Sequence, residues 1–567
     1  MSTSQVDRPL VSDKHTYELA PILGEQWQMS WTFTAMIGWF ALLFLLLNHT
    51  PLALQSTWQH VNSGSRFVSQ DLSLAGFDTS ANYTAQVPLA DGMPAVAESW
   101  LFDSGVFLLA DRLGSQSLSA VIALLASAVI WLWCSTIYRV CGSTKYTLLV
   151  ALALAITWFA DSTHLQSRLI GMVLFGLTMM TIYQPGLFAN DRKNETTHTA
   201  FATWQWLAVA GLFALWANVD GSFWIGLAAL LSIAIGVSYG RVRQFGVRET
   251  VASQQTQQWF LLVNLSALAT LANPQHIGLW QFGVTEKIDE FLAGVPRGHG
   301  LYLPTVMGLT VLMMLAYLAW EIKRSQKTIQ PAAIAMLATM VVLATLAVSN
   351  VYWLIPAVLL VASTLRDRPV AEATKPQATE NKEEKKEERS LRFAGSLCCV
   401  LLIWFAFALS TAGSAVLGGK PRATNRIYQS NVPIAVSSFL NDRHPVAPAD
   451  FGWAASERPL IWAPADWSEW LLWDSPEGTR LFTDSQLDRL PPRVQADYAK
   501  IFRGDADWNR LLDRYAVGTL VLDKHRQPKL ASEAIRHSSW KLVLETHGAM
   551  TLQRMPIARA EKQRGES

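Results

Sequence analysis

Charged residues are scarce in this sequence. Asp, Glu, Lys and Arg make up 16% of its 567 residues, whereas a soluble chain carries roughly 25%. Hydrophobic residues reach 51% and gather in runs of about 20 residues, the length that crosses a bilayer. The net charge of +2 gives no general attraction to nucleic acid. The composition therefore predicts a membrane protein.

Several features that would indicate a particular chemistry are also missing. The four cysteines lie within or beside apolar runs and lack the spacing of a metal site, so we expect neither a disulfide nor a bound metal: Cys134, Cys141, Cys398 and Cys399. No Gly-rich phosphate loop or nucleophile elbow occurs, and no cofactor is expected. The absence of two mirrored halves weakens a secondary-transporter interpretation.

Apolar runs long enough to span a bilayer occur about eleven times. They cover residues 30–48, 117–138, 146–163, 166–184, 203–218, 222–240, 258–273, 303–321, 331–348, 351–365 and 393–417. The 24 tryptophans fit side chains anchored at headgroup level. This pattern predicts a mainly α-helical fold, a polytopic transmembrane bundle of about eleven helices.

The positions of Lys and Arg predict the orientation of the bundle. Alternate connections between the runs are rich in them: Arg139 and Lys145, Arg192 and Lys193, Arg241, Arg243 and Arg248, Lys323, Arg324 and Lys327, and the charged run at 366–392. The other connections are poor in them: Arg66 and Arg112, then Arg168, then Lys287 and Arg297. Because cytoplasmic connections carry the excess, we expect a multi-pass protein of the cytoplasmic (inner) membrane with its N-terminus inside and its C-terminus outside.

This orientation divides the chain into three parts. Residues 1–29 form a cytoplasmic segment, and 30–417 form the transmembrane domain, which contains the first loop (49–116), predicted to lie outside, and a flexible charged cytoplasmic linker (366–392). Residues 418–567 have the composition of a soluble domain, expected outside the membrane. Helices are predicted at 433–442, 466–473, 491–514 with a break at Gly504, and 529–537; strands are predicted at 459–462, 479–484 and 517–522, followed by a hairpin of 541–546 with 549–554. Such alternation predicts a small α/β domain.

The first loop carries six titratable side chains that could take part in chemistry: His60, Asp71, Asp78, Asp91, Glu98 and Asp103. A carboxylate near the lipid headgroups can act as general base for an acceptor hydroxyl. A solvated loop acid or a helix cap is the commoner role of any one of them. We expect Asp103 on a helix surface and Glu98 as a charge at a helix N-terminus.

Two later stretches supply further polar groups. Asp220 lies in a turn between apolar runs, where it either faces the same cavity as the first loop or simply stabilises the turn. The segment 274–302 carries cations able to hold a phosphate by charge-assisted hydrogen bonds, although its glycines suit a plain linker equally well. These residues are His276, Lys287, Arg297 and His299.

Short motifs in this order resemble those of C-type glycosyltransferases, bacterial membrane enzymes that use a polyprenyl-phosphate sugar. The likeness covers most of the apolar region and the C-terminal domain. The matching residues are Trp58, Gln59, His60 and Gly64; Asp78 to Thr84; Ser99-Trp100-Leu101; Trp216, Ala217, Asn218 and Gly221, with Asp220 in a His position; Asn273-Pro274; and Tyr498, Trp508 and the run 511–515.

The resemblance implies transfer of a sugar on the outer face of the membrane by an inverting mechanism. It implies a lipid-linked sugar and a glycan, lipid or protein acceptor as partners. Asp78 is then the candidate base, with His60 and Asp220 as further catalytic candidates. The residues expected to contact the substrates are Trp58, Glu98, Trp100, His276, Lys287, Arg297 and His299.

Two departures from the family pattern keep alternatives open. Ser56 stands where the family has an aspartate, and Asp220 stands where it has a histidine. A non-catalytic relative that serves envelope assembly as a scaffold is therefore one alternative. A polymerase or transporter of lipid-linked glycans is the other.

Overall fold

The structure is a computed structural model. It describes residues 31–52, 55–69, 99–159, 167–191, 201–280, 306–346, 350–366, 382–420, 422, 424–442, 460–476, 479–485, 487 and 490–555. The chain forms two compact units, which are described separately. One contains α1 (Trp31–Asn48) as far as Leu42 and α14 (Lys382–Ala408) as far as Phe407. The other contains the residues from Leu43 to Ala371 and from Ala408 onward.

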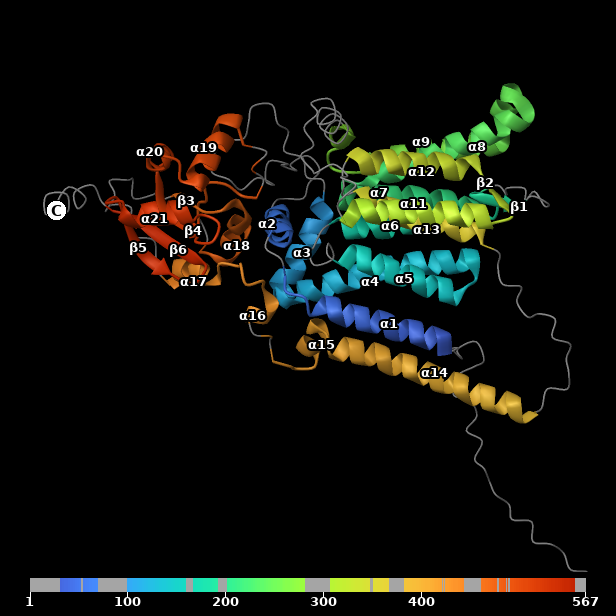
Figure 1. Ribbon diagram of the computed structural model, residues 1–567, viewed down its shortest axis with the longest axis horizontal. Helices are drawn as coiled ribbons and strands as arrows, with labels where there is room; N and C mark the ends of the chain where they lie inside the picture. The colour runs from blue at the N-terminus through green and yellow to red at the C-terminus, as the bar shows by residue number, and fades with distance from the viewer. Residues whose placement is uncertain are drawn as a thin grey trace, which may run out of the picture. The chain divides into compact units, whose positions relative to one another are not determined.

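Each predicted apolar run contains an α-helix (Figure 1). Besides α1 and α14, these are α4 (Gln116–Cys141), α5 (Thr144–Phe159), α6 (Arg168–Ile182), α7 (Thr203–Val219), α8 (Phe223–Ala252), α9 (Gln254–Ala269), α11 (Val306–Arg324), α12 (Pro331–Leu346) and α13 (Val351–Leu365). Within the described residues, α4 and α8 are long and apolar enough to cross a membrane. The chain is thus mainly helical, as predicted, while the number and orientation of spans stay predictions.

Large apolar side chains lie on the exterior of several of these helices. Leu207, Leu268 and Met313 are 71%, 64% and 70% exposed. Exposure of this kind on neighbouring helices is unfavourable in water and natural in lipid. The interior is aromatic: Trp216 stacks on Trp353 with ring centroids 5.9 Å apart, and both rings are buried.

The first loop is not a loop throughout. Its ends form α2 (Gln55–Ser69) and α3 (Trp100–Leu113), which pack against each other. The sequence analysis missed α2, because Asn62, Ser63, Gly64 and Ser65 have low helix propensity and the helix owes its stability to packing.

The charged run also differs from the prediction. α14 begins at Lys382, so the last part of the expected linker is helical, while residues 367–381 lie outside the described residues. Glu, Lys and Arg all have high intrinsic helix propensity, which favours such a helix. A short antiparallel pair of strands, β1 (Ala189–Asp191) and β2 (Lys327–Ile329), was not predicted.

The C-terminal domain is a small mixed sheet covered by helices. Its strands are β3 (Leu460–Trp462), β4 (Val517–Asp523), β5 (Trp540–Glu545) and β6 (Ala549–Arg554), arranged in the order β3-β4-β6-β5. β3 is parallel to β4 and the other pairs are antiparallel. α15 (Thr411–Val416) precedes the domain. The domain's helices are α16 (Thr424–Ile427), α17 (Ile434–Asp442), α18 (Ala465–Asp474), α19 (Pro492–Arg503), α20 (Trp508–Arg514) and α21 (Pro528–Arg536).

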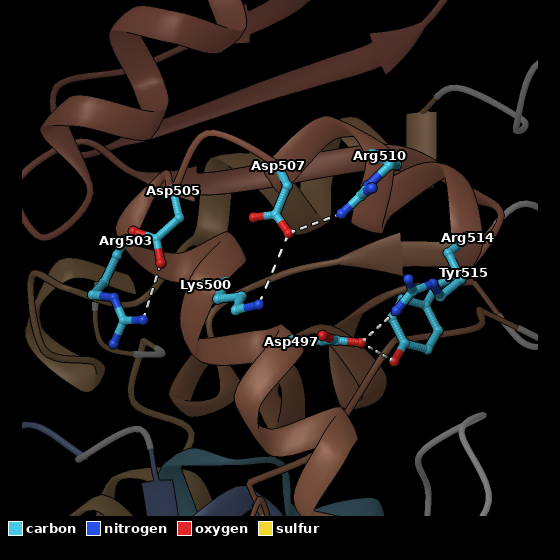
Figure 2. A network of polar contacts seen from close by, with 8 residues as sticks. All are labelled: Asp497, Lys500, Arg503, Asp505, Asp507, Arg510, Arg514 and Tyr515. Carbon is cyan, nitrogen blue, oxygen red and sulfur yellow. Dashed lines mark hydrogen bonds and ion pairs between the residues drawn. The ribbon is translucent and has the colours of Figure 1, made fainter.

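Nearly all elements predicted for this domain are present, including the break at Gly504, which adopts a left-handed conformation (φ 65°). The strand predicted at 479–484 is wrong: only Leu481 makes an isolated bridge, to Ile461. Figure 2 shows how α19 is tied to α20, since Asp497 accepts hydrogen bonds from Arg514 (3.1 Å) and from the Tyr515 hydroxyl (2.8 Å).

Candidate active site around the first-loop helices

The contact between α2 and α3 contains a buried carboxylate–imidazole pair. Asp103 Oδ1 lies 2.7 Å from His60 Nδ1 and accepts a second hydrogen bond, of 3.0 Å, from the Ser99 hydroxyl. Asp103 is only 3% exposed. The sequence analysis expected Asp103 on a helix surface, which is wrong, because its side of α3 faces the unpredicted helix α2.

The environment of this pair sets its chemistry. Burial raises the pKa of Asp103, whereas the charge and hydrogen bond of His60 lower it. His60 Nδ1 is engaged by Asp103, and Nε2 bonds to no residue that the structure describes. The His60 side chain is 14% exposed, so one edge of the ring is accessible. The arrangement orients an imidazole, which suits hydrogen bonding or proton transfer at Nε2.

Gly64 brings the two helices close enough for this pair. A Cβ atom at Gly64 would lie 2.0 Å from the Asp103 carbonyl oxygen and 2.8 Å from Phe107 Cβ. No side chain larger than hydrogen fits there. The glycine in the motif therefore has a packing reason, and it places His60 beside α3.

A second contact joins α3 to α7. The Trp100 indole donates a hydrogen bond of 2.9 Å to Asn218 Oδ1. The amide nitrogen of Asn218 in turn donates to the Ala272 carbonyl oxygen at 2.7 Å. Asn273 follows directly and accepts a hydrogen bond from the Gln275 backbone. Three motifs far apart in the sequence thus meet at one place.

Asp220 ends α7 and is 6% exposed. Its carboxylate accepts a 2.6 Å hydrogen bond from the Ser167 hydroxyl, and it also accepts from the hydroxyl and the backbone N–H of Ser222. These bonds fasten the turn between α7 and α8 to the start of α6. The turn-stabilising role is therefore visible, and the catalytic role of Asp220 stays a prediction.

Trp58 lies on the side of α2 that faces the C-terminal domain. Its ring is fully buried, 4.7 Å from that of Trp470 and 6.1 Å from that of Trp473. Tyr428 completes the cluster at 5.9 Å. In this arrangement the Trp58 ring packs against other aromatic rings, and its part in substrate binding stays a prediction.

A buried polar cluster lies beside these rings. The Asn62 side-chain amide donates to Glu469 Oε2 at 2.8 Å and to the Glu469 carbonyl oxygen at 2.9 Å. Ser485 Oγ donates to Glu469 Oε1 at 2.9 Å. Burial, with the charge of Asp484 second, raises the pKa of Glu469 to about 7. Sequence reasoning missed Glu469, because a single Glu in the predicted helix 466–473 carries no signal of its partner 407 positions earlier.

The remaining predicted site residues divide into two groups. His276 is described: it adopts a left-handed conformation (φ 47°), is exposed, and its Nδ1 lies 3.1 Å from the Leu271 carbonyl oxygen. The others lie outside the described residues: Asp78, Glu98, Lys287, Arg297 and His299. Among the described residues, no three His, Cys, Asp or Glu side chains gather as metal ligands.

Neither a family model nor a curated protein matches this chain. Among solved structures, it is similar to ArnT from Cupriavidus metallidurans in the apo state, at TM-score 0.48 and 12% identity, over 92% of this chain and 97% of that one. It is also similar to the oligosaccharyltransferase of Archaeoglobus fulgidus in the apo form, at TM-score 0.48 and 11% identity, over 93% of this chain and 75% of that one. ArnT bound to undecaprenyl phosphate matches at TM-score 0.45 and 14% identity, over 92% of this chain and 98% of that one.

These structures are of C-type glycosyltransferases that use polyprenyl-phosphate sugars. The predicted resemblance to that family is confirmed in this sense. At these identities and TM-scores the likeness assigns neither donor nor acceptor to this chain. The function must therefore be argued from its own residues.

Proposed function

We propose that this chain is a membrane glycosyltransferase. It moves a sugar from a polyprenyl-phosphate donor to an envelope acceptor on the outer face of the cytoplasmic membrane, and the C-terminal domain lies on the same side. The observation that carries the proposal is the buried His60–Asp103 pair, which joins the two ends of the first loop where the family-like motifs meet. A hydrogen-bonded carboxylate that orients a partly accessible imidazole is an expensive arrangement to bury, and it serves chemistry better than packing.

The reaction assigned to this site is an inverting sugar transfer at the anomeric carbon of the donor. The carboxylate of Asp78 takes the proton of the acceptor hydroxyl, and the acceptor oxygen attacks the anomeric carbon. The bond between that carbon and the phosphate oxygen breaks with inversion, and the polyprenyl phosphate leaves with the electron pair. His60 Nε2 faces the phosphate and donates a hydrogen bond to it, while Asp103 holds the imidazole in this orientation through Nδ1.

The other candidates hold the substrates in place. Lys287, Arg297 and His299 neutralise the phosphate by charge-assisted hydrogen bonds. Trp58, Trp100, Glu98 and His276 are assigned to the sugar and the acceptor. Asp220 supports the site from the α7–α8 turn.

The test is donor turnover. Purified protein in lipid nanodiscs is incubated with a panel of polyprenyl-phosphate sugars, and mass spectrometry follows the release of the bare lipid phosphate. Turnover that is lost in Asp78→Asn, with unchanged protein abundance, is the expected result. Asp111→Asn is the control, since Asp111 is an exposed carboxylate on α3. Retained turnover in Asp78→Asn moves the base to Asp71 or Glu98.

One observation favours a second candidate, a non-catalytic envelope-assembly relative. Asp220 occupies a family His position, yet its carboxylate is satisfied by Ser167 and Ser222 and has a structural use. A folded protein with no turnover on any donor would favour this candidate. Polymerisation of lipid-linked glycans would instead give products longer by several sugar units in the same assay.

A further inference from the structure

Helix α2 is held from two sides. His60 contacts α3, whereas Asn62, two residues later, contacts α18 of the C-terminal domain. Successive helical residues are rotated by about 100°, so these two side chains point in nearly opposite directions. Figure 1 shows α2 between α18 and α3. Any shift of α2 toward or away from α18 therefore moves the His60 ring relative to Asp103.

The contact with α18 is centred on one carboxylate. Glu469 is 2% exposed, and each of its two carboxylate oxygens accepts a hydrogen bond. Through Asn62 it holds α2, and through Ser485 it holds the segment that follows Leu481. Three separate parts of the chain thus depend on a single side chain.

The charges around Glu469 come from two elements. Asp484, 1% exposed, lies on the segment after Leu481, and its charge acts on Glu469. Arg66, one turn after Asn62 on α2, interacts electrostatically with both carboxylates. A cation on α2 that interacts with two carboxylates of the C-terminal domain adds an electrostatic attachment to the hydrogen bonds.

The chain just before α2 is attached to the same domain. The Leu52 backbone N–H donates to the Ile427 carbonyl oxygen at 2.7 Å, and the Gln429 N–H donates to the Leu52 carbonyl oxygen at 3.2 Å. This bridge and the Trp58 cluster fix the start of α2, and Glu469 fixes its middle.

From this geometry we propose that Glu469 is a positioning residue, which holds α2 through Asn62 and so sets the orientation of His60. The inference rests on the function proposed above. Under this proposal the C-terminal domain stays packed on α2 during catalysis and does not act as a lid that closes over the first loop. Opening in each catalytic cycle would have to break a buried contact, the hydrogen bonds at both carboxylate oxygens and the backbone bridge.

The experiment compares the full-length variants Glu469→Ala, Glu469→Gln and Asn62→Ala in nanodiscs. Hydrogen exchange over residues 55–69 is measured together with donor turnover. Loss of a hydrogen bond to a charged group is expected to raise exchange in α2 about tenfold in Glu469→Ala and to lower kcat with little change in KM. Glu469→Gln keeps an acceptor and rescues most of both. Asn62→Ala behaves like Glu469→Ala, and the double variant adds little.

Asp474→Asn is the matched control. Asp474 is a carboxylate on the same helix, but it accepts a hydrogen bond of 2.6 Å from Ser437 of α17 and is hydrogen-bonded to no described residue of α2. Its substitution should leave exchange in α2 unchanged. Unchanged exchange and turnover in Glu469→Ala would overturn the positioning role. The wild-type protein could turn over no donor while Glu469→Ala still exchanges faster in α2. That result would support the attachment of α2 and refute the proposed function instead.

Discussion

Gly64 and Gly105 allow one substitution to be tested at two positions of the same helix pair. Gly64 lies on α2 at its closest approach to α3, where an added Cβ would be 2.0 Å from the Asp103 carbonyl oxygen. Gly105 lies on α3, and an added Cβ there meets nothing within 4 Å. The two alanine variants should therefore change stability in opposite directions.

The structure gives the size of the effect at Gly64. The backbones must separate by about 1.4 Å before the new Cβ reaches an ordinary contact of 3.4 Å. A separation of that size breaks the 2.7 Å contact between His60 and Asp103, because N–H···O bonds reach only to about 3.2 Å. Overpacking and a buried carboxylate without its partner together cost about 3 kcal/mol. At Gly105, alanine favours the helix by up to about 1 kcal/mol.

The assay is thermal unfolding of the purified variants in the same detergent, combined with hydrogen exchange over 55–69. Gly64→Ala should melt at a lower temperature and exchange faster in α2. Gly105→Ala should melt at or above the wild-type temperature with unchanged exchange. If Gly64→Ala is as stable as Gly105→Ala, the close packing of α2 on α3 is refuted, and with it the buried His60–Asp103 pair.

Three further predictions concern single side chains. Asp103→Asn should lower donor turnover at least tenfold while Ser99→Ala lowers it less, because Asp103 holds the imidazole directly and Ser99 acts only through Asp103; equal losses in nanodisc turnover would contradict this. Burial raises the pKa of Glu469 to about 7 from the ordinary 4.5. The folded chain therefore binds this proton more tightly than the unfolded chain does. The contribution of Glu469 to stability thus falls as pH rises from about 4.5 to about 7. The free energy of unfolding should change by an amount on the order of 3 kcal/mol over this range. Between pH 4.5 and 8, the melting temperature of Glu469→Gln should therefore fall less than that of the wild type. Equal slopes in the two proteins would refute this pH dependence. Ser222→Ala removes the hydroxyl that donates to buried Asp220 and keeps the backbone donor, so it should destabilise the chain by about 1–2 kcal/mol in chemical denaturation, whereas no loss would show that Asp220 is satisfied without the hydroxyl.

The apolar helices of this chain were predictable because their signal is local, unlike that of α2. An apolar run such as 331–348 has no polar face, so it suits a helix whose sides are all buried in protein or in contact with lipid. No partner therefore needs to be known to predict α12. The same holds for the C-terminal domain, where Gly504 marks the end of α19 by its own conformational freedom. The strand predicted at 479–484 failed because strand formation depends on a partner, and there only Leu481 bridges to Ile461.

The candidate site was only partly predictable. The sequence by itself determined the membrane-type composition, the helical fold, the α/β domain and His60 as a residue of interest, since each rests on composition, period or a short motif. Only the tertiary structure decided that Asp103 is buried against His60, that Gly64 permits this contact, and that Glu469 holds Asn62. These pairs join residues 43 and 407 positions apart, and a partner at such separation is chosen by the packing of whole helices. Local sequence cannot encode that choice, because the free energy that makes it comes from burial and hydrogen bonding shared between distant elements.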